Sequence, residues 1–124
     1  MKFLMCKRCG NVVTYLSDKY MPMICCADMM IELEPGTEDA AAEKHVPVVD
    51  INGKTVKIKV GSVDHPMTDA HFIKWIVLQT RRGFQVRYLT PIDRPEVTFT
   101  VTEGDNPLAA YAYCNLHGLW EQEI

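Results

Sequence analysis

The sequence predicts an all-β protein in which a small metal-binding N-terminal module precedes a β-sandwich. Four of the five cysteines lie within the first 26 residues. From Val46 onward, short β-prone runs are separated by turn residues at the spacing typical of a sandwich. No segment shows a long helical period.

Length and composition allow one ordinary domain with a small module attached. The chain has 124 residues, 48% hydrophobic and 23% charged, which is the balance of a soluble globular protein. Its net charge of −3 argues against a general nucleic-acid binder, which needs a basic face. No apolar run is long enough for a membrane helix or a secretory signal. We therefore expect a cytoplasmic protein, whose clustered cysteines are metal ligands or redox groups.

The first predicted element is the module at residues 1–33, with β-prone runs at "NVVTYL" and "MIELE". A segment this short buries too little apolar surface to offset its chain entropy, so it needs a disulfide, a metal or a partner. The stretch "EPGTEDAAAE" combines Pro, Gly and acidic residues and is typical of a connector. We expect a linker at 34–42 and the second domain at 43–124.

The cysteines of the module are spaced as metal ligands. Cys6 and Cys9 form a CxxC turn followed by Gly10, a common way to direct two thiolates at one ion. Cys25 and Cys26 are adjacent, so an extended backbone would place their side chains on opposite sides. Both reach one metal only if the backbone bends there, which distorts the tetrahedron. Two disulfides or buried free cysteines are the alternatives, and thiolate count alone does not separate zinc from iron.

The sequence of the second domain predicts a series of short strands. "VPVVDI" and "KTVKIKV" flank the dipeptide Asn52-Gly53, which predicts a hairpin with a type I′ turn. In "KTVKIKV" the apolar residues alternate with lysines, the period of a half-buried strand. "FIKWIVLQT" and "FQVRYL" form a second hairpin through "RRG", and "EVTFTV" and "LAAYAYC" supply two more strands.

A second set of metal-ligand candidates comes from this domain. All four histidines of the chain lie at predicted strand ends or in loops next to Pro or Gly, where a rigid sandwich can present ligands. A lone histidine is more often a surface or core residue, but a cysteine lies three residues before the last of them. Four imidazoles and one thiolate differ from zinc's usual four ligands and suit an iron with one open coordination position. The candidates are His45, His65, His71, Cys114 and His117.

Six segments of the sequence carry a family resemblance, in this order: "CKRCG", "CC", "EKHVPV", "KVGSVDHPM", "HFIKWI" and "YCNLHGLW". Together they resemble the desulfoferrodoxin family, the two-iron class of superoxide reductase. The resemblance spans essentially the whole chain, and small departures such as Leu119 lie outside the ligand positions. It implies a desulforedoxin-like module and an immunoglobulin-like β-sandwich. It also implies reduction of superoxide to hydrogen peroxide without release of oxygen, rubredoxin or a similar electron donor, and a homodimer.

The resemblance further implies two iron ions per chain. The four N-terminal cysteines would hold one iron in a distorted tetrahedral site. The four histidines would form the equatorial plane of the other, with Cys114 as its axial ligand. Lys44 would steer superoxide and hold a proton-donating water, and Glu43 resembles the family carboxylate that caps ferric iron once peroxide has gone. A solvated surface pair is the alternative for Glu43 and Lys44. The first-site ligands are Cys6, Cys9, Cys25 and Cys26.

Two other functions fit parts of the sequence. A non-catalytic electron carrier would use only the four-cysteine iron, which leaves the histidines and Cys114 unexplained. A zinc-binding interaction module followed by a sandwich is the second alternative. The colour and metal content of the protein separate all three, because a zinc protein is colourless whereas ferric thiolate sites absorb visible light.

Overall fold

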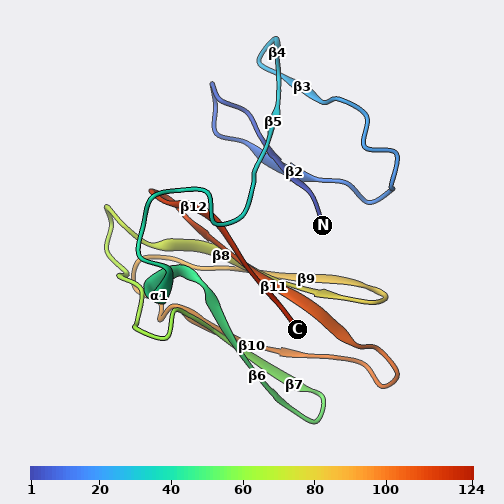
Figure 1. Cartoon of the computed structure of the whole chain (residues 1–124), viewed down its shortest axis with the longest axis vertical. Helices are drawn as coiled ribbons and strands as arrows, with labels where there is room; N and C mark the ends of the chain where they lie inside the picture. The colour runs from blue at the N-terminus through green and yellow to red at the C-terminus, as the bar shows by residue number, and fades with distance from the viewer. The chain divides into compact units, whose positions relative to one another are not determined.

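The computed structural model describes all 124 residues (Figure 1). The chain forms two compact units, Met1–Glu34 and Pro35–Ile124. Nearly all of the regular structure is β-strand, as predicted. The one helix is the single turn α1 (Ala42–His45). No helix has the length and apolar character needed to cross a membrane.

The first unit contains five very short strands. β1 (Phe3–Met5) lies between β2 (Val12–Thr14) and β5 (Ile31–Glu32) in one sheet, and β3 (Ile24–Cys25) pairs with β4 (Asp28–Met29) in a hairpin. Its core cluster consists of only three buried residues, Leu4, Cys6 and Met30. One of the candidate metal ligands is therefore also part of the small core of this unit.

The second unit is a β-sandwich of two antiparallel sheets, which confirms the predicted architecture. The smaller sheet has the order β10 (Glu96–Thr100), β7 (Thr55–Val60), β6 (Pro47–Asn52). The larger sheet has the order β12 (Gly118–Glu123), β11 (Pro107–Cys114), β8 (Ile73–Thr80), β9 (Gly83–Tyr88).

The core of the second unit follows the two-residue period of its strands. Val56, Ile58 and Val60 on β7 are at most 1% exposed, whereas the lysines between them face outward. They pack in one cluster with residues of β8, β10 and β11 that include Ile76 and Cys114. Cys114 is the last residue of β11, so the core holds this thiol at the end of the sheet.

The first hairpin differs from its prediction at the turn. Asn52 pairs with Thr55, so the two central residues are Gly53 and Lys54 rather than Asn52 and Gly53. Only Gly53 has a positive φ, of 61°, which matches a type II′ turn and makes the type I′ prediction wrong. The reason is register: Pro47 pairs with Val60, and this pairing puts the alternating apolar residues of β7 into the core. The final strand, β12, was also missed by the sequence analysis.

Candidate metal centres

The four cysteines of the first unit converge on one point. The Cys9 Sγ lies 3.7 Å from the Cys25 Sγ, which is 3.9 Å from the Cys26 Sγ. All four sulfur atoms lie within 4.8 Å of one another. Thiolates bound tetrahedrally at about 2.3 Å from an ion are separated by about 3.8 Å. The spacing of the sulfurs therefore fits a single tetrahedral metal.

Two backbone features produce this convergence. The Gly10 amide donates to the Cys6 carbonyl at 2.9 Å, and Gly10 has a φ of 77°, which closes the CxxC turn. Cys26 and Ala27 have φ values of 54° and 62°, a left-handed conformation that non-glycine residues rarely adopt. The predicted bend at the adjacent cysteine pair is therefore present, and it turns both thiols toward the same point.

The electrostatics of these thiols favour a bound cation. The Cys9 backbone N–H lies 3.5 Å from the Cys6 Sγ and, by donating to it, lowers the pKa of Cys6 to about 6. The neighbouring sulfurs of Cys6 and Cys9 raise the pKa of Cys25 to about 12. One thiol of the cluster ionises readily, and once ionised it makes the ionisation of a neighbouring thiol less favourable. All four become thiolates together only when a positive ion compensates their charge.

In the second unit the four imidazoles form a square. Neighbouring ring centroids are separated by 4.7, 4.6, 5.0 and 4.9 Å around the ring, and neighbouring planes are inclined by 78° to 84°. The diagonal from His45 to His71 is longer, 6.3 Å. Four imidazoles arranged in this way would offer four donors to a single ion.

The nitrogen atoms that face inward are at metal-binding separations. The His45 Nε2 is 3.2 Å from the His65 Nε2 and 3.1 Å from the His117 Nδ1. Adjacent nitrogens bound at about 2.1 Å to one ion lie about 3.0 Å apart. The outer nitrogens are held by carbonyls, since each of the His45 and His65 Nδ1 atoms lies 2.7 Å from a backbone oxygen, of Ala41 and Pro66 respectively. Donation by Nδ1–H leaves the Nε2 lone pair free to bind a metal.

Burial prepares these imidazoles for ligation. It is the main cause of a lowered pKa at His45, His65 and His71, and it brings the pKa of His65 to about 4. The rings are therefore neutral near pH 7, which is the form that binds metal ions. The buried Nε2 of His71 has no hydrogen-bond partner, an arrangement that is costly unless an ion occupies the centre of the square.

Cys114 completes this set. Its side chain is fully buried, and its Sγ lies 3.9 Å from the His117 Nδ1. The Cys114 sulfur and the inward nitrogens of His45, His65 and His71 lie within 4.8 Å of one another. Burial raises the pKa of Cys114, so a nearby cation is required to hold this thiol as a thiolate at neutral pH. The five donors predicted from the sequence are thus brought together.

Sequence reasoning assigned no role to Trp120, which supports two of these histidines. Its Nε1–H donates to the His117 carbonyl at 2.9 Å, and its ring lies 4.9 Å from the His45 ring. The signal was available, because a tryptophan three residues after a ligand on a short hairpin can pack back on it. Trp120 thus packs against the ring of His45 and holds the backbone of His117.

Glu43 and Lys44 lie on α1, immediately before His45, and both are exposed. Burial and then the neighbouring His117 lower the pKa of both His45 and His71, and the Lys44 charge lowers both by a smaller amount. Its positive potential therefore reaches two opposite corners of the square. The Glu43 carboxylate acts in the other direction on the pKa of His45, as the smallest contribution.

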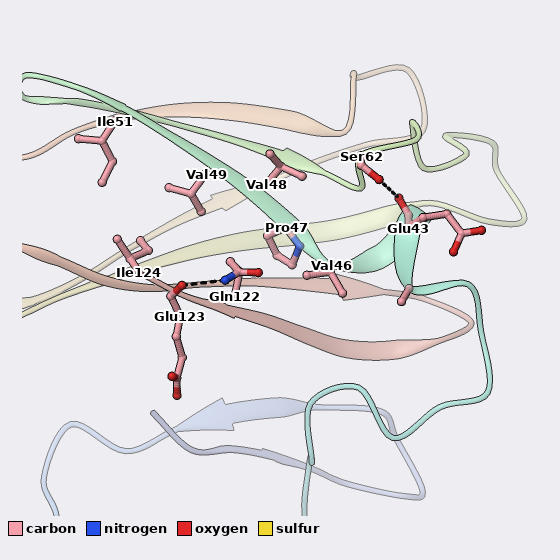
Figure 2. A pocket seen from close by; sticks show the side chains of 11 residues that line it. Glu43, Val46, Pro47, Val48, Val49, Ile51, Ser62, Gln122, Glu123 and Ile124 are labelled. Carbon is pink, nitrogen blue, oxygen red and sulfur yellow. Dashed lines mark hydrogen bonds between the residues drawn. The ribbon is translucent and has the colours of Figure 1, made fainter.

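A groove of about 520 Å³ runs beside α1 and along β6, and apolar side chains such as Val48, Val49 and Ile51 line it (Figure 2). None of the four histidines lines this groove, nor does Cys114. This groove is therefore distinct from the cluster of metal-ligand candidates.

Comparison with known proteins identifies similar chains. The family model described as Desulfoferrodoxin matches residues 37–123. A desulfoferrodoxin from Syntrophotalea carbinolica is 44% identical over 95% of this chain and 92% of its own length. The crystal structure of the superoxide reductase from Treponema pallidum covers 98% of both chains at 40% identity, with a TM-score of 0.82.

A shorter structural neighbour matches only part of the chain. The superoxide reductase (1Fe-SOR) from Giardia intestinalis is 33% identical and has a TM-score of 0.58. The match covers 97% of that protein but 66% of this chain.

Proposed function

This chain belongs to the desulfoferrodoxin family, and from that membership we propose that it is a two-iron superoxide reductase. The observation that carries the proposal is the square of four imidazoles with the buried Cys114 thiol beside it. A structural zinc site is closed by four ligands, whereas this set offers five donors and leaves an octahedral ion one open position.

The proposed ligands follow from the inward-facing atoms. The Sγ atoms of the four N-terminal cysteines would hold one iron. The other would be held by Nε2 of His45, His65 and His71, Nδ1 of His117 and Sγ of Cys114. When bound there, iron would supply the electron that, with two protons, converts superoxide to hydrogen peroxide.

The ligand charges favour an anionic substrate. Four neutral imidazoles add no charge and one thiolate adds a negative one, so a divalent ion leaves the set with a charge of about +1. The solvent-exposed Lys44 adds a second positive charge, whose potential reaches His45 and His71. We assign to Lys44 the attraction of superoxide and the holding of a water that donates protons to the product.

Glu43 and Cys114 complete the assignment of roles. We assign to the exposed Glu43 carboxylate the capping of the open position after the product has left, which would keep other anions out. The Cys114 thiolate would bind the iron and donate electron density to it, as thiolate ligands do in haem proteins. Its burial excludes water from the sulfur.

The proposal extends to electron delivery, assembly and location. Cys9 and Cys26 are exposed, so the sulfurs of the first site are accessible to an electron-donor protein such as rubredoxin. The homodimer follows from the family resemblance. A cytoplasmic location agrees with five cysteines of which none forms a disulfide.

The test combines metal analysis with a single-turnover reaction. The purified protein is expected to contain two irons per chain, and its ferric form to show visible bands from both thiolate sites. Mixing the reduced protein with a pulse of superoxide should yield one hydrogen peroxide per superoxide and no oxygen. A colourless protein containing zinc, or formation of oxygen in proportion to peroxide, would contradict the proposal.

A further inference from the structure

The turn that carries Glu43 and Lys44 is not stable by itself. Helix α1 has only four residues, and its N-cap residue, Ala41, makes no side-chain capping hydrogen bond. So short a helix is unfavourable in isolation, because nucleation fixes several residues for few hydrogen bonds. Contacts from outside the turn must therefore hold Glu43 and Lys44 in place.

These contacts come from the loop that follows β7. The Val63 amide donates to the Glu43 carbonyl at 3.0 Å, and the Ser62 hydroxyl donates to the same oxygen at 3.3 Å, as Figure 2 shows. The Gly61 amide donates to the Val46 carbonyl at 3.1 Å. Three consecutive residues of one loop thus bind both ends of the segment Glu43–Val46.

Gly61 leaves no room for a side chain at this contact. Its φ is 84°, and a Cβ built on it would lie 2.7 Å from the Lys44 carbonyl oxygen and 2.8 Å from the Glu43 carbonyl oxygen. A Cβ would also collide with the Val63 carbonyl. These neighbours are backbone atoms, so no side-chain rotation relieves the overlap.

The other side of the contact is rigid. Gly61 directly follows Val60, which is fully buried and donates its amide to the Pro95 carbonyl at 2.7 Å. Because the sheet holds β7, we expect a side chain added at position 61 to displace the short turn and the Val63 carbonyl rather than the strand. We expect this movement to affect the proposed ligand His45 less, because the Ala41 carbonyl lies at hydrogen-bond distance from its Nδ1 and Trp120 packs against its ring.

We propose that Gly61 is a positioning residue, whose missing side chain allows the turn to seat against the β7 loop and thereby sets the location of Lys44 and Glu43 beside the metal centre. The effect on turnover rests on the proposed role of Lys44. The placement of the turn does not, and it can be measured separately.

The chain supplies a matched control. Gly104 also has a φ of 84°, but a Cβ at that position meets nothing within 4 Å. Gly61→Ala and Gly104→Ala therefore impose the same left-handed backbone on alanine, and only the first introduces the collision. A difference between the two variants therefore reports the collisions at position 61, with the turn and with the Val63 carbonyl, and not the strain of the residue. Amide exchange in residues 41–47 shows whether the turn is displaced.

The experiment uses the full-length iron-loaded protein. We expect Gly61→Ala to keep both irons and the ferric thiolate bands, and to show faster amide hydrogen exchange than Gly104→Ala in a peptide covering residues 41–47. Its second-order rate with superoxide should fall about tenfold, with a weaker salt dependence. Lys44→Ala should lower the rate of the parent protein but add little in the Gly61→Ala background, since the two changes act through one charge.

Several results would overturn the proposal. One is equal exchange and equal rates in Gly61→Ala and Gly104→Ala. Another is loss of iron from Gly61→Ala alone, which would show that Gly61 acts through His45. If Lys44→Ala alone leaves the rate unchanged, the role of Lys44 is wrong, and amide exchange decides the role of Gly61. If Gly61→Ala does not fold, Ser62→Ala decides: we expect about a twofold lower rate from the lost hydrogen bond, and a parental rate refutes the proposal.

Discussion

The two units of this chain use metal ligands in opposite ways. In Met1–Glu34 the core cluster has three buried residues, and one of them is the ligand Cys6. In Pro35–Ile124 the core cluster has twelve buried residues. The proposed ligand Cys114 is one of them and lies at the end of β11, and the other eleven form an apolar core without it. We therefore expect the first unit to depend on a bound metal for its fold, whereas the apolar core of the second unit folds it and positions the proposed ligands.

This difference explains why only one site is suited to chemistry. Four thiolates close a tetrahedron around the first ion and leave no position for a substrate. The first unit cannot give up a ligand, because the ligands replace a missing core. The sandwich is stabilised by its apolar core, so it can hold five donors and leave a sixth position open.

The largest expected effect follows from removing iron. Chelation of the reduced protein should unfold residues 1–34 and leave the sandwich folded, because only the first unit lacks an adequate core. Amide hydrogen exchange by mass spectrometry checks this: protection should vanish in the peptides of the first unit and persist in β7, β8 and β11. Retained protection of β1 and β5 in the iron-free protein would contradict the expectation that only the first unit needs its metal to fold.

The variant Cys9→Ser perturbs the metal of the first site alone. Replacing a soft thiolate with a hydroxyl should leave the first site weak or empty, with loss of its visible bands. Oxidation of the second iron by superoxide should largely survive in a single turnover, since the open position belongs to the other unit. A Cys9→Ser protein that has lost this reaction would show that the assignment of two independent sites is wrong.

The next effect concerns the axial thiolate. Cys114→Ser substitutes a hard, mostly protonated hydroxyl for an electron-donating sulfur, while the four imidazoles remain available to bind iron. The ferric thiolate band of the second site should disappear and the rate with superoxide should fall sharply, with the strands of the sandwich still protected. Persistence of that band would exclude Cys114 as the axial ligand.

A smaller effect is expected from the core of the sandwich. Ile58 is fully buried, and Ile58→Ala should destabilise the second unit by about 2–4 kcal/mol through the cavity that it leaves. Ile92, which is 95% exposed, supplies the control, since Ile92→Ala removes almost no buried surface. Chemical denaturation followed by tryptophan fluorescence measures both. The visible bands of the four-cysteine site should be unaffected by either change, and their loss in Ile58→Ala would link the two units.

The sequence was most informative where one physical constraint dominated. The alternation in "KTVKIKV" predicted the buried face of β7, because a strand with one buried face has a period of two residues. The adjacent pair Cys25-Cys26 predicted a backbone bend, because no extended chain directs two neighbouring thiols to one point. The sequence positions of the five second-site donors, with the family resemblance, were enough to identify the set that converges.

Features that depend on packing between distant segments were not predictable. The hairpin turn lies one residue later than its Asn-Gly signal indicated, since strand register overrode the local turn preference. β12 was missed because its pattern is broken by Trp120 and followed by charged residues. The close approach of Gly61 to the turn of Glu43 and Lys44 joins segments nearly twenty residues apart, and nothing local to either segment marks it.

The smallest predicted effect tests the charge beside the second site. Lys44→Ala removes an exposed cation but no ligand, so iron content and spectrum should stay the same. The second-order rate with superoxide should fall about tenfold at low salt, because the attraction of an anion is lost. Added salt should slow the parent protein more than the variant, since it screens a charge that the variant lacks.

Glu43→Ala is the matched control for this charge. Glu43 is the neighbouring residue on the same turn and carries the opposite sign, yet its proposed role begins after the product has left. Its removal should leave the initial rate with superoxide intact and change only the later ferric spectrum, which stopped-flow or pulse-radiolysis traces resolve. If Lys44→Ala instead reacts at the parental rate with the parental salt dependence, Lys44 is a solvated surface residue. The attraction of superoxide then comes from the metal centre alone, and the second unit supplies its function through its ligands without help from the turn that precedes them.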